Sequence, residues 1–154
     1  MTNDAMTTNN APRKRWLAVL ARATRLELED ARAAIADLPS IEHVRSPEPG
    51  MVMLRGRVGG TGDTFNLGEA TVTRCALRTS AGALGVGYTL GRDRRKAELV
   101  ALFDALLQDQ TRQATLEREV IAPMQQRQSA QREASSRSAA ASRVEFFTFV
   151  RGEA

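Results

Sequence analysis

Residues 84–107 read LGVGYTLGRDRRKAELVALFDALL and carry the strongest structural signals of this 154-residue chain. From Leu84 to Gly91, large and small residues alternate with the period of a β-strand. From Ala97 to Leu107, apolar residues recur at helical spacing. The pattern predicts a strand followed closely by a long helix, which covers one face of a sheet.

The strand has an unusual face that consists mainly of glycine. Glycine weakens a strand unless another backbone has to approach it closely. Gly85 and Gly87 therefore predict a close contact on this face. Either a helix of the same chain or a partner subunit could make that contact, and we include both glycines among the candidate partner-interface residues.

Two further helices are predicted near the N-terminus. Residues 1–11 are small and polar, which is typical of a disordered tail. Pro12 fits the first turn of a helix, and the apolar residues after it recur at helical spacing. Thr24 and Glu27 have the spacing of a capping box at the start of a second helix, which Pro39 ends. Together these helices form a helical hairpin.

Four segments have the composition of β-strands. Residues 46–50, Ser-Pro-Glu-Pro-Gly, predict a turn between the first two of them. The connections are too short for helical crossovers, so an antiparallel sheet is expected. The predicted strands are Ile41–Arg45, Met51–Val58, Thr71–Thr79 and Leu84–Leu90.

The C-terminal part differs from the rest in composition. Pro123 interrupts a polar helix, and residues 125–142 contain almost no large apolar side chain. Three of the seven aromatic residues nevertheless fall within residues 146–149. A polar tether followed by clustered aromatic residues is typical of a segment that folds on binding. Two interpretations stay open: the tail packs on its own sheet, or it docks on another protein through Phe146, Phe147 and Phe149.

The predicted fold class is α+β. Its parts are an N-terminal helical hairpin, an antiparallel sheet of about four strands, a long covering helix and a C-terminal helical extension with an aromatic docking tail. A chain of this length can bury a sizeable core without disulfides or metals. We expect a single α+β domain over residues 12–122, while residues 123–154 form the C-terminal helix and the partner-docking tail.

Composition argues against several classes of protein. No apolar run approaches the length of a membrane span, and no export signal is seen, so a cytoplasmic protein without membrane contact is expected. One histidine and one cysteine cannot form a conventional metal site. The net charge is +4. Basic exceed acidic residues only by 7 to 6, 8 to 7 and 7 to 5 in residues 1–47, 48–109 and 110–154. This even spread disfavours nucleic acid as a partner, and a small basic nucleic-acid-binding module remains the alternative.

Two segments have features of anion-binding sites. Glycines around a hydroxyl, as in residues 59–62, let backbone amides approach an anion, although they also suit a tight turn between strands. Several cations lie at the predicted start of the helix near Asp93, where a bound phosphate or an acidic partner would offset their repulsion by the helix dipole. A merely solvated charge run is the other interpretation. The candidate anion-binding residues are Gly59, Gly60, Thr61, Gly62, Arg74, Arg92, Arg94, Arg95 and Lys96.

No known motif for independent catalysis is found. The chain lacks a nucleophile elbow, a Walker A lysine, a dinucleotide fingerprint and a His/Cys metal cluster. His43 and Cys75 are interpreted as residues that are packed or have their hydrogen bonds satisfied, rather than as catalysts. We therefore predict no catalytic residue in this chain, and no metal or cofactor bound by the chain alone.

Four sequence blocks occur in a characteristic order. They read GGTGDTFNLGEATVTR at 59–74, GYTLGRD at 87–93, IAP at 121–123 and SRVEFFTFVRG at 142–152. Together they resemble the PhnG family of the carbon–phosphorus lyase system. The resemblance runs from about Arg15 to the C-terminus, and it departs from the family pattern over residues 1–11 and 125–141.

The resemblance implies a bacterial, cytoplasmic subunit that acts in the degradation of organic phosphonates. Members of this family act with PhnH, PhnI and PhnL proteins to replace the adenine of ATP by methylphosphonate, which gives α-D-ribose 1-methylphosphonate 5-triphosphate. ATP, with Mg²⁺, and methylphosphonate are then ligands of the complex rather than of this chain. Because the glycosyl transfer is attributed to the PhnI-type subunit, the resemblance implies an accessory role, with PhnI, PhnH and other subunits as partners.

Overall fold

The computed structural model describes residues 10–141, which form helices and a three-stranded sheet. Residues 1–9 of the tail predicted over 1–11 lie outside the described residues, as does the aromatic tail with Phe146, Phe147 and Phe149. Ala11 belongs to the first described helix, which corrects the predicted boundary at that residue. The elements are α2 (Ala11–Arg22), α3 (Arg25–Ala33), β1 (Ile41–Arg57), a 3-10 turn (Val58–Gly60), β2 (Thr64–Thr79), β3 (Leu84–Leu90), α4 (Arg94–Leu106), α5 (Gln110–Leu116), a π-helical turn (Glu117–Ile121) and α6 (Ala122–Ala141).

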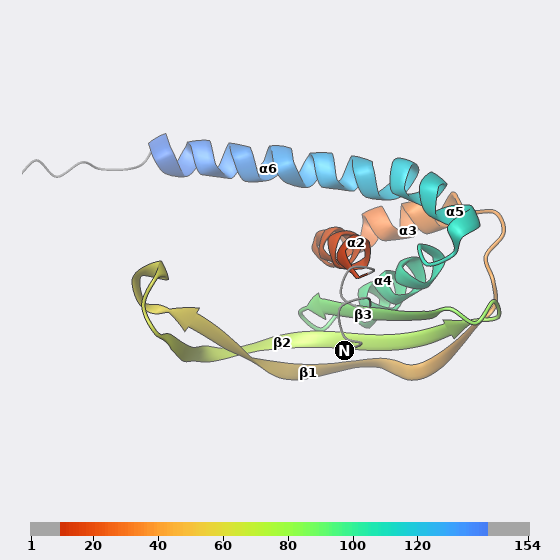
Figure 1. Cartoon of the computed structure of the whole chain (residues 1–154), viewed down its shortest axis with the longest axis horizontal. Helices are drawn as coiled ribbons and strands as arrows, with labels where there is room; N and C mark the ends of the chain where they lie inside the picture. The colour runs from red at the N-terminus through yellow and green to blue at the C-terminus, as the bar shows by residue number, and fades with distance from the viewer. Residues whose placement is uncertain (1–9, 142–154) are drawn as a thin grey trace, which may run out of the picture.

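The sheet is antiparallel with the strand order β1-β2-β3, as Figure 1 shows. Its three strands correct the expected number of about four, because residues 46–50 continue β1 instead of turning. Pro47 and Pro49 lack the amide hydrogen that a central strand needs, but β1 is an edge strand, where proline is tolerated. Register shifts between His43 and Arg45 and between Arg45 and Glu48 accommodate the irregular stretch.

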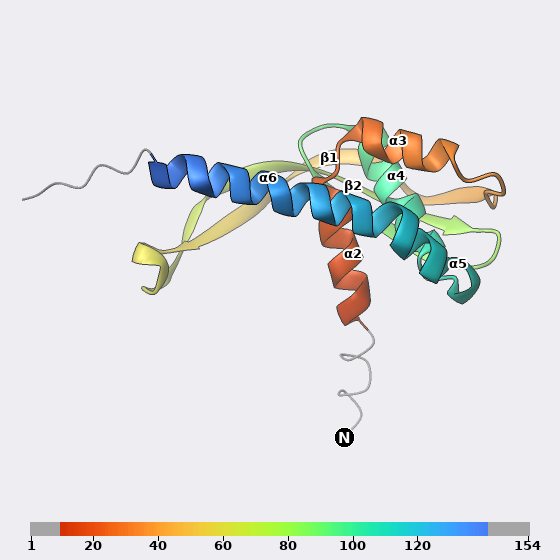
Figure 2. The same cartoon turned by 90° about the horizontal axis from the view of Figure 1, so that it is seen from above.

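Helix α4 covers one face of the sheet, as the sequence predicts. It contacts β3 and β2 on one side and the helices α2 and α3 on the other. The α-helices of residues 10–141 lie on the same side of the sheet (Figure 1), and α6 runs across α2 when the molecule is seen from above (Figure 2). Fully buried side chains from three layers form the core; the largest of them are Phe103, Leu20, Leu28, Leu77, Leu99 and Leu107.

The glycine face of β3 lies directly against α4. A Cβ atom added to Gly85 would lie 1.9 Å from the Ala101 carbonyl oxygen, and one added to Gly87 would lie 2.1 Å from the Ala97 carbonyl oxygen. Only glycine permits this approach. The first of the two alternatives is thus confirmed, and the expectation that Gly85 and Gly87 contact a partner subunit is corrected, because the chain's own helix covers both.

Helices α2 and α3 point in different directions in Figure 2 and each packs on α4, so the predicted helical hairpin is corrected to two separately packed helices. The second of them begins with the predicted capping box. The Thr24 hydroxyl accepts a hydrogen bond from the Glu27 amide at 3.2 Å, and the Glu27 carboxylate accepts one from the Thr24 amide at 2.8 Å. Helix α3 ends at Ala33, earlier than the predicted end before Pro39. Ile35 and Leu38 nevertheless pack against the core from the following connection.

A fully buried carboxylate connects α4 with α2 and β3. Asp104 accepts hydrogen bonds from the Arg13 guanidinium at 2.7 and 3.1 Å, from Trp16 Nε1 at 2.9 Å and from the Val86 amide at 2.9 Å. A buried charge is tolerated when it is paired and fully hydrogen-bonded. The Val86 contact also satisfies a backbone amide on the outer edge of β3.

The C-terminal helices are continuous where an interruption is expected at Pro123. The π-helical turn over Glu117–Ile121 comes immediately before α6, so Pro123, which lacks an amide hydrogen, falls where the hydrogen-bond pattern of the helix changes. Early residues of α6 contact the body of the molecule: Met124 is buried, and Gln128 Nε2 donates to the Val19 carbonyl oxygen at 2.9 Å. Residues 130–141 are exposed, and this part of α6 projects beyond α2 and α4 (Figures 1 and 2).

Candidate partner interface

The face of the sheet opposite α4 is covered by no helix of the described part of the chain (Figure 1). Strand alternation directs Tyr88 and Leu90 of β3 to this face, and their exposed fractions are 54% and 72%. Of the thirteen large hydrophobic residues that are exposed within residues 10–141, twelve fall in the segment 41–90. They are Ile41, Val44, Met51, Val52, Met53, Leu54, Val58, Phe65, Leu67, Leu84, Tyr88 and Leu90. Such a concentration is typical of a surface that binds a partner.

The second half of β1 and the first half of β2 extend beyond α4 as a two-stranded ribbon (Figure 1). We call residues 51–57 and 64–70 the ribbon. Its register pairs Met51 with Thr71 and Leu54 with Gly68, and the Phe65 ring lies beside Gly56. An isolated two-stranded ribbon is marginally stable in water. We therefore expect that contact with another protein surface stabilises the ribbon.

The glycine-rich loop lies at the tip of the ribbon and closes on itself. Gly59 and Gly60 have positive φ angles of 59° and 83°, which this turn requires. The Gly62 amide donates to the Val58 carbonyl oxygen at 2.8 Å, and Arg57 donates to the Gly62 carbonyl oxygen at 3.3 Å. This geometry favours the structural interpretation, a tight connection between two strands, for the loop that includes Thr61.

The basic run at the start of α4 is partly neutralised within the chain. Asp93 caps the helix by accepting from the Lys96 amide at 2.9 Å. Arg95 pairs with Glu98 at 2.6 Å and with Glu29 at 3.6 Å. Burial lowers the pKa of the Lys96 ammonium group, against the opposing effect of Asp93. Within residues 10–141, no carboxylate pairs with the exposed side chains of Arg92 and Arg94.

The predicted anion-binding residues do not converge on one site. Arg74 lies on the uncovered face of the sheet, opposite Tyr88 in the register, and pairs with Glu48 at 3.0 Å. The basic run follows β3, whose end pairs with Val72 of β2. Thr64, next to the glycine-rich loop, is eight residues away along the same strand, or about 26 Å. The sequence suggested that all these residues bind anions, but in the structure they lie in separate parts of the molecule.

The histidine is exposed but has a hydrogen-bond partner, and the cysteine is buried. His43 Nε2 lies 3.0 Å from Glu98 Oε1, so this pair joins β1 to α4. Cys75 is buried beneath α4, and its burial raises the pKa of the thiol to about 11. The thiol is therefore protonated at neutral pH and a poor nucleophile. The described residues contain no group of three or more His, Cys, Asp or Glu side chains placed to hold a metal ion.

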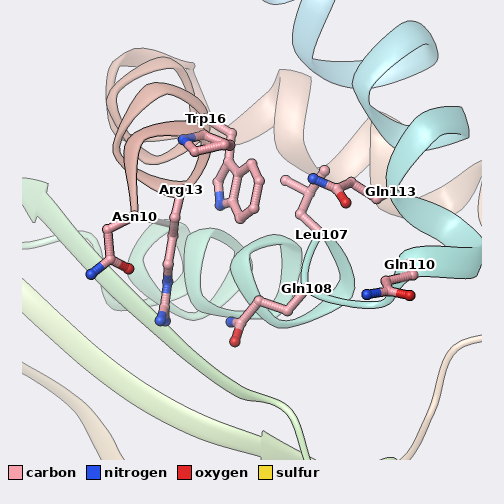
Figure 3. A pocket seen from close by; sticks show the side chains of 8 residues that line it. Asn10, Arg13, Trp16, Leu107, Gln108, Gln110 and Gln113 are labelled. Atoms are coloured by element: carbon pink, nitrogen blue, oxygen red, sulfur yellow. The ribbon is translucent and has the colours of Figure 1, made fainter. Parts of the chain in front are cut away.

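A polar cavity of about 330 Å³ lies between α2 and the start of α5 (Figure 3). Its lining residues are Asn10, Pro12, Arg13, Trp16, Leu107, Gln108, Gln110 and Gln113. Two of its polar groups are already engaged: Arg13 binds Asp104, and Gln108 Nε2 donates to the carbonyl oxygens of Leu84 and Asp104 at 2.8 and 3.0 Å. This engagement makes the cavity a structural junction. Sequence reasoning missed it because its residues come from distant segments.

Sequence reasoning also missed the exposed residues of the sheet as interface candidates. The alternation of β3 offered a signal, because a glycine face that fits one helix leaves the large residues on the other face without a partner element. None of the described helices is long and apolar enough to cross a membrane. An exposed apolar surface of this extent is typical of a site that binds a partner.

Comparisons with known proteins place the chain among its relatives. Residues 11–152 match the family described as phosphonate metabolism protein PhnG. The chain is also 48% identical over 145 residues to the alpha-D-ribose 1-methylphosphonate 5-triphosphate synthase subunit PhnG of Rhizobium meliloti (strain 1021). This similarity covers 93% of the present chain and 91% of that protein.

Proposed function

The chain belongs to the PhnG family of phosphonate metabolism proteins, and from this premise we propose that it is an accessory subunit that organises the synthase of α-D-ribose 1-methylphosphonate 5-triphosphate. The relative that it matches over nearly its full length is a subunit of that synthase. In this role the chain binds other subunits and positions them, while a partner supplies the groups that react.

The uncovered apolar face of the sheet, with its ribbon, is the observation that carries this proposal. Twelve exposed hydrophobic residues lie within one segment of 50 residues. A surface of this kind is costly for an isolated protein in water, because it leaves apolar area unburied. An accessory subunit gains that burial when the complex forms.

The reaction follows from the family. With PhnH, PhnI and PhnL-type proteins, the synthase replaces the adenine of ATP by methylphosphonate. Breaking the N-glycosidic bond calls for an acid that assists the departing base and for stabilisation of an oxocarbenium-like sugar. In this chain, Cys75 is buried and protonated, and His43 is held by Glu98. We therefore place the reacting groups, ATP with Mg²⁺ and methylphosphonate on the PhnI-type partner and the assembled complex, and we assign no catalytic residue or bound cofactor to this chain.

Co-expression tests the proposal. The chain is produced alone and together with its PhnH, PhnI and PhnL-type partners, and the mass of each eluting species is measured along with release of adenine from ATP in the presence of methylphosphonate. We expect a stable heteromeric complex that releases adenine and an isolated chain that does not. Adenine release by the isolated chain would contradict the proposal, and so would a chain that elutes alone when its partners are present.

A further inference from the structure

We propose that the free edge of β1 at Met51–Leu54 pairs with a β-strand of another subunit of the synthase, and that this partner strand carries carboxylates beside an apolar centre. The inference rests on the proposed function, because it names the contact through which the accessory subunit binds. It concerns backbone pairing along one edge, which the proposed function alone does not require.

The two halves of β1 differ in how well their outer edge is protected against pairing with another strand. Among the described residues, β1 pairs only with β2, so no strand of residues 10–141 lies on its other edge. In the first half, Pro47, Pro49 and two register shifts disturb this edge, and such features prevent pairing with foreign strands. From Gly50 to Leu54 the strand has no proline and no register shift. The protected first half is followed in the same strand by the unprotected segment 50–54, which ends at a third register shift between Leu54 and Arg55. The open edge is therefore a local property of this short segment.

The unprotected segment exposes apolar side chains on both faces of the ribbon. Met51 and Met53 alternate with Val52 and Leu54, and their exposed fractions are 66, 54, 36 and 41%. A flat surface would cover only one of the two faces. A strand that pairs edge-on brings side chains to both faces and also satisfies the open backbone groups. Four consecutive exposed apolar residues in an edge strand would otherwise promote aggregation.

The charges next to this segment indicate the chemistry of the partner strand. Arg55 donates to Thr64 Oγ1 at 3.0 Å, and Arg57 donates to the Gly62 carbonyl oxygen at 3.3 Å. Within residues 10–141, neither arginine forms an ion pair with a carboxylate. Opposite charges on adjacent strands stabilise their pairing. An apolar strand with a carboxylate beside it therefore complements this edge.

A second copy of the chain fits this edge less well. Two copies that extend one sheet by antiparallel pairing place residues of the same face opposite each other. Pairing centred on Val52 sets Arg55 opposite Pro49, and pairing centred on Met53 sets Arg55 opposite Met51. Neither register supplies a carboxylate to the arginines. The charge pattern thus favours a different subunit over self-association.

The experiment compares full-length variants in assembly with the other synthase subunits. Met53→Lys puts a charge on the edge, and Leu26→Lys is the matched control, because Leu26 on α3 is 67% exposed and lies away from the sheet. The second variant, Arg55→Glu with Arg57→Glu, reverses the charge. We expect Met53→Lys and the double variant each to raise the dissociation constant of the complex about tenfold or more, while Leu26→Lys leaves it unchanged. Melting temperatures of the isolated variants confirm that each one folds.

Hydrogen exchange supplies the readout that is specific to strand pairing. In the wild-type complex, amides of residues 51–57 should gain protection relative to the isolated chain, because edge amides become hydrogen-bonded. Wild-type assembly that both variants preserve, or that leaves these amides unprotected, overturns the inference and leaves the proposed function standing. A wild-type chain that does not assemble overturns both.

Two further outcomes would assign the edge to another occupant. If the isolated wild-type chain dimerises and Met53→Lys abolishes the dimer, a second copy covers the edge. If removal of residues 142–154 exposes the amides of residues 51–57 in the isolated chain, the chain's own tail covers it. Either result overturns the proposal.

Discussion

On the helix side of the sheet, Thr73, Cys75 and Leu77 of β2 are buried beneath α4, whereas on the other side Tyr88 and Leu90 of β3 expose more than half of their side chains. Both faces belong to the same strands. The first face gains its burial from the chain's own helix, whereas no helix within residues 10–141 covers the second. Stability and assembly are therefore expected to depend on different sides of one sheet.

The largest effect on stability is expected at Asp104, which belongs to the helix side. Asp104→Ala leaves Arg13 and the Val86 amide without their buried partner, and breaking such a pair costs about 3–5 kcal/mol in the free energy of unfolding. Denaturant unfolding measures this loss. Asp63→Ala, in the exposed loop, is the control and should change stability by less than about 0.5 kcal/mol. A loss below about 1 kcal/mol for Asp104→Ala would show that the hydrogen bonds of this carboxylate contribute little to stability.

A pair of leucine substitutions tests the comparison between the faces directly. Leu77→Ala creates a cavity under α4 and should lower the free energy of unfolding by about 2–5 kcal/mol. Leu90→Ala removes a side chain that is already exposed and should change it by less than about 0.5 kcal/mol. In co-purification with the other subunits, Leu90→Ala should weaken the complex. Equal effects of the two substitutions on stability would show that the faces do not differ as described.

The glycine face is expected to tolerate no side chain. Gly87→Ala places a methyl group against the Ala97 carbonyl oxygen and should destabilise the fold by about 1–3 kcal/mol. Gly50→Ala is the matched control in β1, because no atom lies within 4 Å of its added Cβ. Thermal unfolding of both variants distinguishes a steric clash with α4 from the general effect of replacing a glycine in a strand by alanine. Equal melting temperatures would contradict the close approach of α4.

The smallest effect concerns the capping box and depends on pH. The hydrogen bond from the Thr24 amide is the largest cause that holds the pKa of Glu27 below its ordinary value of 4.5. A lowered carboxylate pKa stabilises the fold above the unfolded-state pKa, and this contribution disappears as the pH falls through the folded-state pKa. Glu27→Ala should cost about 0.5–2 kcal/mol at pH 7 and progressively less in acid.

Unfolding curves at several pH values measure this dependence. Glu133→Ala, on the exposed part of α6, is the control and should show no such change. A cost of Glu27→Ala that is the same at pH 7 and in acid would contradict the role of its ionised carboxylate.

Local signals in the sequence gave the elements that depend on neighbouring residues. The capping box of Thr24 and Glu27, the helix after Asp93 and the close approach at Gly85 are all confirmed, because each follows from spacing or from backbone geometry. The turn predicted at residues 46–50 was wrong. There, pairing with β2 and the ion pair of Glu48 with Arg74 outweigh the turn propensity of proline and glycine.

The remaining features depend on contacts between distant segments. Arg13 and Asp104 are 91 residues apart, so no local pattern reveals their pair. An apolar residue in a predicted strand fits the same sequence pattern whether it lies in a core or at an interface. For this reason Met53 and Leu90 were not predicted as interface residues. The cations Arg74 and Arg95 looked available for an anion, but Glu48, Glu29 and Glu98 already pair with them.

The protonated, buried thiol of Cys75 has a practical consequence for studies in solution. Since it is the only cysteine of the chain, the native protein offers alkylating dyes almost no reactive sulfur. A cysteine introduced on an exposed part of the sheet would then be labelled selectively, without removal of the native residue. The fold thus provides a ready background for fluorescence measurements of how and when the subunit joins its complex.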